Sequence, residues 1–285
     1  MTPLLSIPGL PPIAAFLFGA CVGSFLNVCI ARWPREQSVV RPRSRCPKCG
    51  HQLAWFENIP LVSWFALRAR CRCCDEVISP MYPIIELTVA LGWLACVLAL
   101  GPTFTALRFA IFGTILLGVA VTDFQTYLIP DGFTLFGLAF TLATAIVSFF
   151  LGETSLFAGP YDALIGACAG AGLIAIVGWL GEVALKREAM GLGDVTLMAF
   201  IGGALGPQRA IITVFVASAI GAVAFVAVVY PVVWFRRAHG REQTELALGG
   251  AHVEAPLVPF GVFLAPAAVL TLLWGDALLG WLIRS

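Results

Sequence analysis

Five cysteines lie between residues 46 and 74 of this 285-residue chain, in the groups Cys46-Pro-Lys-Cys49 and Cys71-Arg-Cys73-Cys74. Taking Cys71 and Cys74 as the second pair gives two C-x2-C pairs, separated by 21 residues. Each pair forms a turn that directs two sulfur atoms at one point, and four thiolates are the ligand set of a closed tetrahedral zinc site. The spacing therefore predicts zinc bound by Cys46, Cys49, Cys71 and Cys74, with iron in a rubredoxin-like site as the main rival.

Two other residues are alternative ligands. Cys73 can replace Cys74, although the x2 spacing favours Cys74, and His51 is the nearest histidine. Because four protein ligands leave no coordination position open for water, we expect a structural metal rather than a catalytic one. Such an ion would hold together an insert of roughly 50 residues, too small and too polar to fold on a hydrophobic core alone.

After the cysteines, the acidic residues inside apolar segments are the second group of candidate functional residues. A carboxylate at bilayer depth costs about 2.5–3.5 kcal/mol on insertion scales, so each one suggests a function. The positions at issue are Glu86, Asp123, Asp131, Asp162, Glu182, Asp194 and Asp276. We expect Asp162, Glu182 and Asp276 to lie near interfacial water, and Asp131, after Ile129-Pro130, to be a helix-capping residue.

Asp123 and Asp194 differ from the others because they come from separate segments and are expected at similar depth. Two carboxylates within a few ångströms cannot both ionise, so one holds a proton. Such a pair can activate a water molecule and protonate a leaving amide nitrogen, which is aspartic protease chemistry. Gly191 and Gly193, on either side of Leu192, would let a substrate peptide approach Asp194 closely. Paired acids also occur in proton-coupled transporters, so a transporter is the alternative interpretation.

The composition indicates that lipid surrounds the elements that position these residues. Hydrophobic residues make up 60% of the chain and charged residues 12%, and the mean hydropathy is +0.94. These values exclude an ordinary soluble domain, a disordered chain and a nucleic-acid-binding surface. Seven apolar segments are long enough to cross a bilayer, and an eighth, 195–205, is short. The eight segments are 13–31, 83–100, 104–122, 133–151, 161–185, 195–205, 210–235 and 257–282.

The basic residues predict the orientation of these spans. If the short segment crosses, fourteen of the 17 Lys and Arg residues lie on one face, nine of them between residues 32 and 82. The positive-inside rule then makes this face cytoplasmic. We predict an all-α membrane protein of about eight spans, with both termini outside. The expected parts are a first span (1–31), a cytoplasmic four-cysteine insert (32–82) and a seven-span core (83–285).

A series of motifs resembles one family, the bacterial type IV prepilin peptidases. The motifs occur in order from about residue 19 to 265, which makes the match specific. They are Gly23-Ser-Phe-Leu-Asn-Val28, Arg32-Trp-Pro34, the cysteine pairs, Glu57-Asn-Ile-Pro-Leu-Val-Ser-Trp64, Tyr82-Pro-Ile-Ile-Glu86, Asp123-x5-Ile129-Pro-Asp131, Gly191-Leu-Gly-Asp194 and Pro259-Phe-Gly261.

The resemblance implies a bifunctional enzyme of the bacterial inner membrane. Its peptidase activity would use the acids that match Asp123 and Asp194 to cut the basic leader from type IV prepilins and pseudopilins, after a glycine and usually before a phenylalanine. Its methyltransferase activity would methylate the new N-terminal amine with S-adenosylmethionine, and the zinc insert accompanies bifunctional members. Expected partners are therefore prepilin membrane helices and the lipid bilayer, and no nucleic acid.

Three further residues are weaker candidates. Glu188, beside the proposed site, would hold the basic leader or instead form a local ion pair. Glu57 and Asn58 are candidates for the methyl-donor site, with turn formation as their alternative role. The insert has no Rossmann-type glycine motif that would mark such a site. Besides the transporter, a membrane scaffold carrying a zinc-knuckle interaction module remains an alternative.

Overall fold

The computed structural model describes residues 10–152, 156–186, 190–229, 231 and 259–284. All regular elements in these ranges are helices, which confirms the predicted all-α fold. The long helices are α1 (Leu10–Arg32), α3 (Met81–Leu100), α4 (Phe104–Thr126), α5 (Asp131–Leu151), α6 (Pro160–Leu185), α7 (Leu192–Leu205), α8 (Pro207–Ala224) and α10 (Gly261–Arg284). Short turns of helix are η2 (Trp33–Arg35), η3 (Trp55–Asn58), α2 (Val62–Ala66) and η4 (Phe225–Val229).

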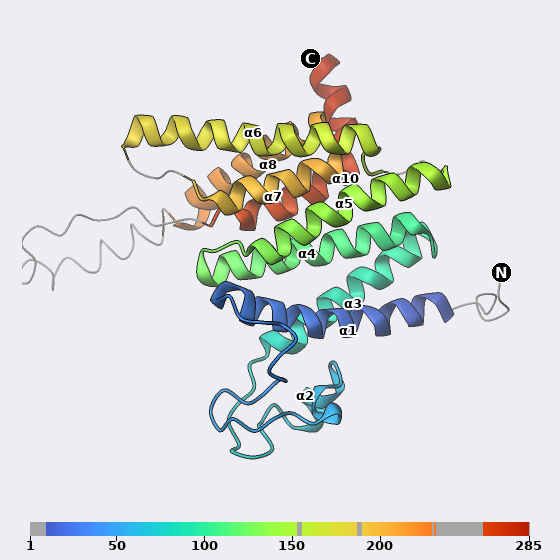
Figure 1. Cartoon of the computed structure of the whole chain (residues 1–285), viewed down its shortest axis with the longest axis vertical. Helices are drawn as coiled ribbons and strands as arrows, with labels where there is room; N and C mark the ends of the chain where they lie inside the picture. Colours follow the sequence, from blue (N-terminus) through green and yellow to red (C-terminus); the bar gives the residue numbers. More distant parts are fainter. Residues whose placement is uncertain (1–9, 153–155, 187–189, 230, 232–258, 285) are drawn as a thin grey trace, which may run out of the picture.

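Seven of these helices are long and apolar enough to cross a membrane, and the chain is a multi-pass membrane protein. Successive helices run in alternating directions through the bundle (Figure 1). The helix α7 has 14 residues, or about 21 Å at 1.5 Å per residue, which is shorter than a hydrocarbon core of about 30 Å. It nevertheless runs alongside the longer helices, and a full crossing by α7 stays a prediction.

The short helix α7 lies in the interior of the bundle. Leu197, Met198, Phe200 and Ile201 are fully buried, as expected for a helix that is apolar on every side. The Phe200 ring packs against Phe112 of α4, with ring centroids 5.2 Å apart. Because most residues from Leu197 to Leu205 are buried by neighbouring helices, this part of α7 is held in place against α4 and α6.

Glycines allow the helices α6 and α7 to approach each other closely. A Cβ added to Gly166 would lie 2.2 Å from the carbonyl oxygen of Gly202, and one added to Gly202 would lie 2.1 Å from that of Gly166. The two backbones therefore touch directly, as small residues permit between membrane helices. A similar contact joins α1 and α3, where a Cβ at Gly23 would lie 2.8 Å from the Cα of Glu86.

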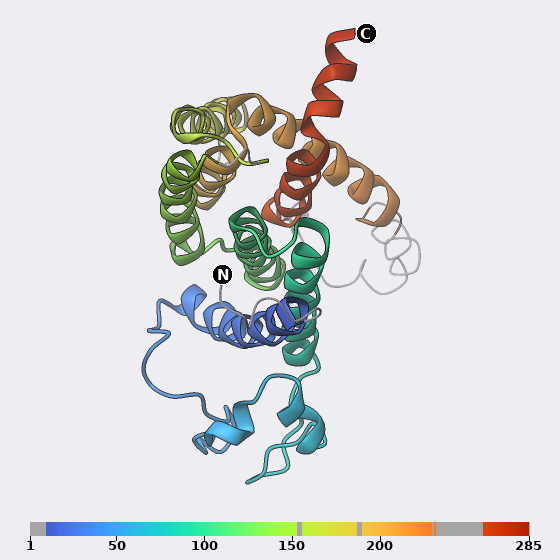
Figure 2. The same cartoon turned by 90° about the vertical axis from the view of Figure 1, so that its right-hand side faces the viewer.

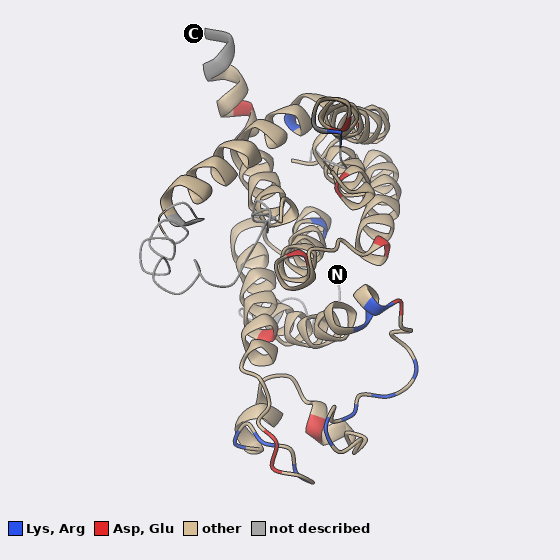
Figure 3. Ribbon diagram, turned by 90° about the vertical axis from the view of Figure 1, so that its left-hand side faces the viewer, with Lys and Arg blue, Asp and Glu red and all other residues tan. Residues whose placement is uncertain are grey.

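The insert between α1 and α3 stands outside the bundle. In two views it lies beyond α1 and α3, on the side away from α6 and α7 (Figures 1 and 2). In Figure 3 most of the ribbon coloured for Lys and Arg lies in this insert, and the described helices carry little of it. The charged part of the chain is thus concentrated at the polar insert, as the sequence pattern predicted.

Candidate functional sites

Two similar turns carry the four cysteines. An isolated antiparallel β-bridge between Arg45 and Gln52 encloses Cys46 and Cys49. A second such β-bridge, between Arg70 and Val77, encloses Cys71 and Cys74. In the first turn the N–H of Gly50 donates to the carbonyl of Cys46, and in the second the N–H of Asp75 donates to that of Cys71, both at 3.0 Å. Both turns therefore have the same knuckle geometry, closed by a residue with positive φ: Gly50 at 71° and Asp75 at 54°.

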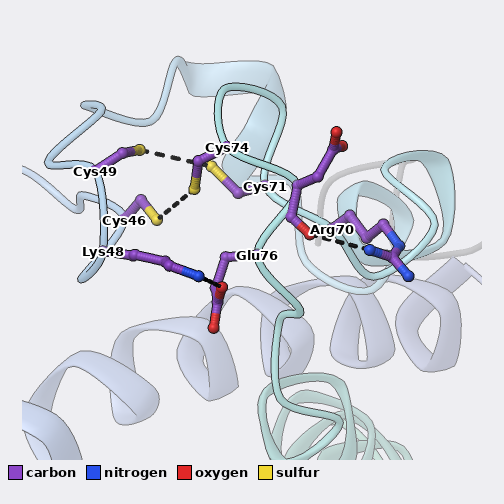
Figure 4. A network of polar contacts seen from close by, with 8 residues as sticks. Cys46, Lys48, Cys49, Arg70, Cys71, Cys74 and Glu76 are labelled. Carbon is purple, nitrogen blue, oxygen red and sulfur yellow. Dashed lines mark hydrogen bonds and ion pairs between the residues drawn. The ribbon is translucent and has the colours of Figure 1, made fainter.

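The sulfur atoms of the two knuckles converge on one point (Figure 4). All four Sγ atoms lie within 4.8 Å of one another. The distances Cys46 Sγ–Cys74 Sγ and Cys49 Sγ–Cys71 Sγ are 3.8 and 3.9 Å. A tetrahedron with metal–sulfur bonds of about 2.3 Å has edges of roughly 3.8 Å, so this arrangement fits a zinc ion.

The thiols of the cluster differ in pKa because they lie in contact with one another. Hydrogen bonds from the backbone N–H groups of Cys49 and Lys48 lower the pKa of Cys46 to about 6, whereas burial and the neighbouring thiols raise the pKa of Cys49 and of Cys74. An exposed ion pair between Lys48 and Glu76 joins the two knuckles (Figure 4). Neither alternative ligand belongs to the cluster: the sulfur atom of Cys73 is not among the four that converge, and the His51 ring contacts the carboxylate of Glu57.

Asp123 lies in the last turn of α4 and is covered by the start of α10. Its side chain is 4% exposed, and its Oδ2 accepts a hydrogen bond of 3.2 Å from the N–H of Val262. A Cβ added to Gly261 would lie 2.8 Å from the same Oδ2. The amino-terminal end of a helix, with its unpaired N–H groups, therefore faces this carboxylate and fixes its orientation.

Asp194 lies in the first turn of α7, close enough to Asp123 for the two carboxyl groups to interact electrostatically. Ile129 connects the two positions. A Cβ at Gly193 would lie 2.9 Å from the Ile129 Cβ, and one at Gly261 would lie 3.0 Å from its Cδ1. The ends of α4, α7 and α10 thus meet around Ile129, and the structure brings the two predicted acids together.

The two predicted substrate-contacting glycines are in different environments. Gly193 is packed against Ile129, so its lack of a side chain serves the contact between α7 and the loop that joins α4 to α5. A Cβ at Gly191 would meet only the Gly193 nitrogen, 3.9 Å away, and Leu192 beside it is 84% exposed. Only the backbone at Gly191 is therefore open to a substrate. Glu188 lies outside the described residues.

Asp131 starts α5 but does not cap it. The cap position is Pro130, the described contacts give this cap no side-chain hydrogen bond, and the Asp131 side chain is exposed in the first turn. Its charge still interacts favourably with the positive end of the helix dipole. The expected capping hydrogen bond was wrong because the extended residue before the helix is Pro130, with φ of −66° and ψ of 135°, so that Asp131 is already the first residue of the first turn.

Glu86 has a structural partner that the sequence did not indicate. Its carboxylate is buried and accepts hydrogen bonds from the N–H of Leu61, at 2.7 Å, and from the Ser24 side chain. Nearby, the Asn27 side chain donates to the carbonyl of Tyr82 at 3.1 Å. These polar groups lie where α1, α3 and the insert meet, and they hold the insert against the bundle.

Glu57 and Asn58, the two candidates for the methyl-donor site, lie in different environments. The Glu57 carboxylate is 6% exposed and accepts a hydrogen bond of 2.8 Å from the Ala54 N–H. This bond, together with His51, holds the pKa of Glu57 below its usual range. Glu57 thus stabilises the η3 turn, its alternative role, whereas Asn58 is exposed and lines a pocket of about 360 Å³.

Comparison with known proteins identifies the family. The model of the type IV leader peptidase family matches residues 110–226, and the model of the bacterial peptidase A24 N-terminal domain matches residues 17–100. Proteins named prepilin leader peptidase/N-methyltransferase are 33% identical to the chain in Aeromonas hydrophila, with 95% of this chain and 93% of that protein covered, and 32% identical in Pseudomonas aeruginosa, with 96% and 95% covered. The chain belongs to the type IV leader peptidase family.

A relative of the same name in Myxococcus xanthus is 45% identical over 204 residues. That alignment covers 70% of this chain and 59% of the relative, which is less than two thirds of the relative's length. No solved structure matches the chain.

The two family models divide the observed sites between them. The N-terminal model covers α1, the four-cysteine insert and α3, and the leader peptidase model covers α4 to α8 with Asp123 and Asp194. Gly261 and Val262, which cover Asp123, lie beyond the range of either model. They were missed as site residues, although the Pro259-Phe260-Gly261 motif before the last helix marked the position.

Proposed function

We propose that this chain is an intramembrane aspartic endopeptidase that removes the basic leader of type IV prepilins and pseudopilins after a glycine. The observation that carries this proposal is the pairing of Asp123 and Asp194 where α4, α7 and α10 meet. One carboxylate takes a proton from a water molecule as it attacks the scissile carbonyl, and the other donates a proton to the leaving nitrogen. The Val262 N–H donates to the Oδ2 of Asp123 and would hold this carboxylate in place during the reaction.

The position of the acids fits a membrane-helix substrate with a charged leader. Both acids belong to the helix ends on the side where α1 enters the basic insert (Figures 1 and 3). We assign this side to the cytoplasm, because of its positive charge, and the protein to the bacterial inner membrane. A prepilin that spans the membrane would then present its scissile bond at the level of the dyad, next to the open backbone at Gly191. The transporter and scaffold alternatives gain no support from the relatives.

A second activity follows from the relatives' names. We assign to this chain the N-methylation of the new N-terminal residue, usually phenylalanine, with S-adenosylmethionine as methyl donor. The four-cysteine site would hold a structural zinc ion, whose geometry the sulfur atoms already match. The working parts are then the first span (1–31), the cytoplasmic insert (32–82) and the seven-span peptidase core (83–285).

The test of the peptidase is cleavage of a purified prepilin by the full chain in detergent, followed by gel shift. Asp123→Asn and Asp194→Asn keep the side-chain shape but remove the acid, and we expect each to lower the rate by at least 1,000-fold, the order of effect seen for protease groups that act as a unit. Asp131→Asn, an exposed acid at the start of α5, is the matched control and retains cleavage. Wild-type rates in either of the first two variants would exclude the dyad.

A further inference from the structure

The insert exposes a group of apolar side chains in and between its two helical turns, η3 and α2. Their exposed fractions run from 37% to 75%, and all of them fall between residues 55 and 65. Single apolar side chains are common on protein surfaces, but a concentrated group of large ones marks an interaction surface. We call this group the apolar surface of the insert, and its members are Trp55, Phe56, Ile59, Val62 and Phe65.

We propose that the apolar surface of the insert enters the membrane leaflet beside the bundle, and that the basic residues around it bind the headgroups of anionic phospholipids. This leaflet is the one on the side that the positive charge assigns to the cytoplasm. Segments that lie in a membrane interface combine aromatic and aliphatic side chains, buried about 5–10 Å, with Lys and Arg at the level of the headgroups. The proposal concerns how the insert meets the membrane and depends on neither catalytic activity.

The hydrogen bond that fastens Leu61 to α3 sets the depth of this surface. Its acceptor, Glu86, is the sixth residue of α3 and lies about 7 Å along the helix from Met81, at 1.5 Å per residue. The Glu86 backbone packs against Gly23 of α1, which is nine residues, or about 13 Å, before Arg32 at the end of that helix. The start of α2 is therefore level with the ends of two membrane spans and does not stand beyond them.

The orientation of the insert agrees with this depth. In Figure 1 the insert lies beside α1, and α2 is on the side of the insert that points toward the amino-terminal end of α1, which is the direction across the membrane. Figure 2, turned by 90°, shows that the insert extends sideways from the bundle. A segment that extends sideways at this level lies over lipid, because no other part of the described chain covers it.

Contacts within the insert fix which side of α2 is free. The indole N–H of Trp64 donates to the carbonyl of Ile78 at 3.2 Å, which holds α2 against the chain that follows the second knuckle. Val62 and Phe65 are three residues apart, share one face of the turn, and are both exposed. This face of α2 is thus presented outward by a turn that is anchored on its other side.

The charges around the apolar surface are complementary to an anionic leaflet. From residue 37 to residue 74 the one acid is Glu57, whose carboxylate is buried and accepts from the Ala54 N–H. The guanidinium of Arg72 lies 5.6 Å from the centre of the Phe56 ring, so positive charge and aromatic surface meet directly. Anionic lipids attract such a polybasic segment. The exposed charged residues in this range are all basic: Arg41, Arg43, Arg45, Lys48, Arg68, Arg70 and Arg72.

A pocket beside η3 offers a place for one headgroup. It has a volume of about 360 Å³ and lies between the last turns of α1 and the insert. Arg32 and Arg43 line it together with the exposed Trp55, and no acidic side chain does. Guanidinium groups bind phosphate oxygens through paired hydrogen bonds, and indole rings favour the membrane interface. The lining therefore fits the phosphate of an anionic phospholipid.

Photocrosslinking of the full chain in lipid nanodiscs tests the depth of the apolar surface. The probe p-benzoylphenylalanine is placed at Phe65 or, as the control, at Lys48. The two side chains are exposed to similar extents, 68% and 64%, but Lys48 forms an ion pair with Glu76 that belongs in water. We expect lipid adducts, measured by mass spectrometry, to be at least tenfold more abundant from position 65. Thermal unfolding checks that both variants are folded.

The headgroup is tested in nanodiscs that contain equal amounts of phosphatidylglycerol and phosphatidylcholine. We expect the adducts from position 65 to contain phosphatidylglycerol at least about three times as often as phosphatidylcholine. Adding Arg43→Gln, in the pocket, should lower this preference at least twofold. Arg41→Gln, which loses the same charge two residues away and does not line the pocket, should have a smaller effect.

Three results would overturn the proposal. Equal yields of lipid adduct from positions 65 and 48 would show that the apolar surface lies in water. Adducts from position 65 to protein in place of lipid would make this surface a contact with another part of the chain or with a second copy. Equal capture of the two lipids would exclude an anionic headgroup. Leader cleavage and methylation are measured separately, so none of these results bears on the proposed function.

Discussion

The carboxylate of Glu86 in α3 accepts a hydrogen bond of 2.7 Å from the backbone N–H of Leu61, which fastens the insert to the bundle. Losing a buried acceptor leaves its donor unsatisfied at a cost of about 1–3 kcal/mol. We expect Glu86→Ala to speed amide hydrogen exchange at Leu61 at least tenfold. Glu86→Gln, which keeps an acceptor oxygen, should have a smaller effect.

Glu76→Ala is the control for this experiment, because it removes an exposed acid of the insert that pairs with Lys48, whereas the Leu61 N–H donates to Glu86. Unchanged exchange at Leu61 in Glu86→Ala would mean that the insert is held by other contacts.

The close approach of α10 to Asp123 predicts a sensitive glycine. In Gly261→Ala the new methyl group would lie 2.8 Å from the Asp123 Oδ2 and 3.0 Å from the Ile129 Cδ1. Displacing the carboxylate by a few tenths of an ångström misaligns the dyad, so we expect a loss of at least tenfold in kcat for leader cleavage. Gly280→Ala in the same helix, with no atom within 4 Å of its Cβ, should cleave normally. Equal rates for the two variants would argue against the observed packing of α10.

The contact between α6 and α7 predicts a stability defect at a distance from the acids. A Cβ at Gly202 would lie 2.1 Å from a backbone oxygen, which cannot rotate away as a side chain would. Gly202→Ala should therefore destabilise the protein by at least about 2 kcal/mol, within the range for overpacked cores. Thermal unfolding in detergent measures this, with Gly172→Ala, whose Cβ meets no atom within 4 Å, as the control. Equal unfolding temperatures for Gly202→Ala and Gly172→Ala would show that α6 and α7 can move apart with little loss of stability.

The cysteine cluster predicts the metal content of the protein. Cys46→Ser combined with Cys71→Ser removes one ligand from each knuckle, and we expect bound zinc, measured by plasma mass spectrometry, to fall from one per chain to below about 0.1. Cys73→Ser, an exposed cysteine outside the cluster, should keep its zinc. Stoichiometric zinc in the double variant would place the metal elsewhere, and iron in the wild type would favour the rubredoxin-like alternative.

Features encoded over short stretches were predictable. Hydropathy over about 20 residues marked the spans, and the C-x2-C spacing marked the knuckles, because a turn of this kind is closed by bonds within five residues, such as Gly50 to Cys46. The pairing of Asp123 with Asp194 was predictable only as a hypothesis, from their expected depth at the ends of separate helices.

Other features depend on which elements pack together. Glu86 and Glu57 are both acids within recognisable motifs, and the sequence did not show that one fastens the insert while the other caps a turn. The cap expected at Asp131 failed for a local reason, the proline before it. The distinction between Gly191 and Gly193 came from Ile129, which contacts only the second.

The sequence by itself thus determined that this is a helical membrane protein with a four-cysteine insert, because solvent preference and local turn geometry are properties of short segments. The tertiary structure alone decided what surrounds Asp123 and Asp194. The N–H that orients Asp123 belongs to Val262, 139 residues along the chain, and only the packing of α10 against α4 brings the two together.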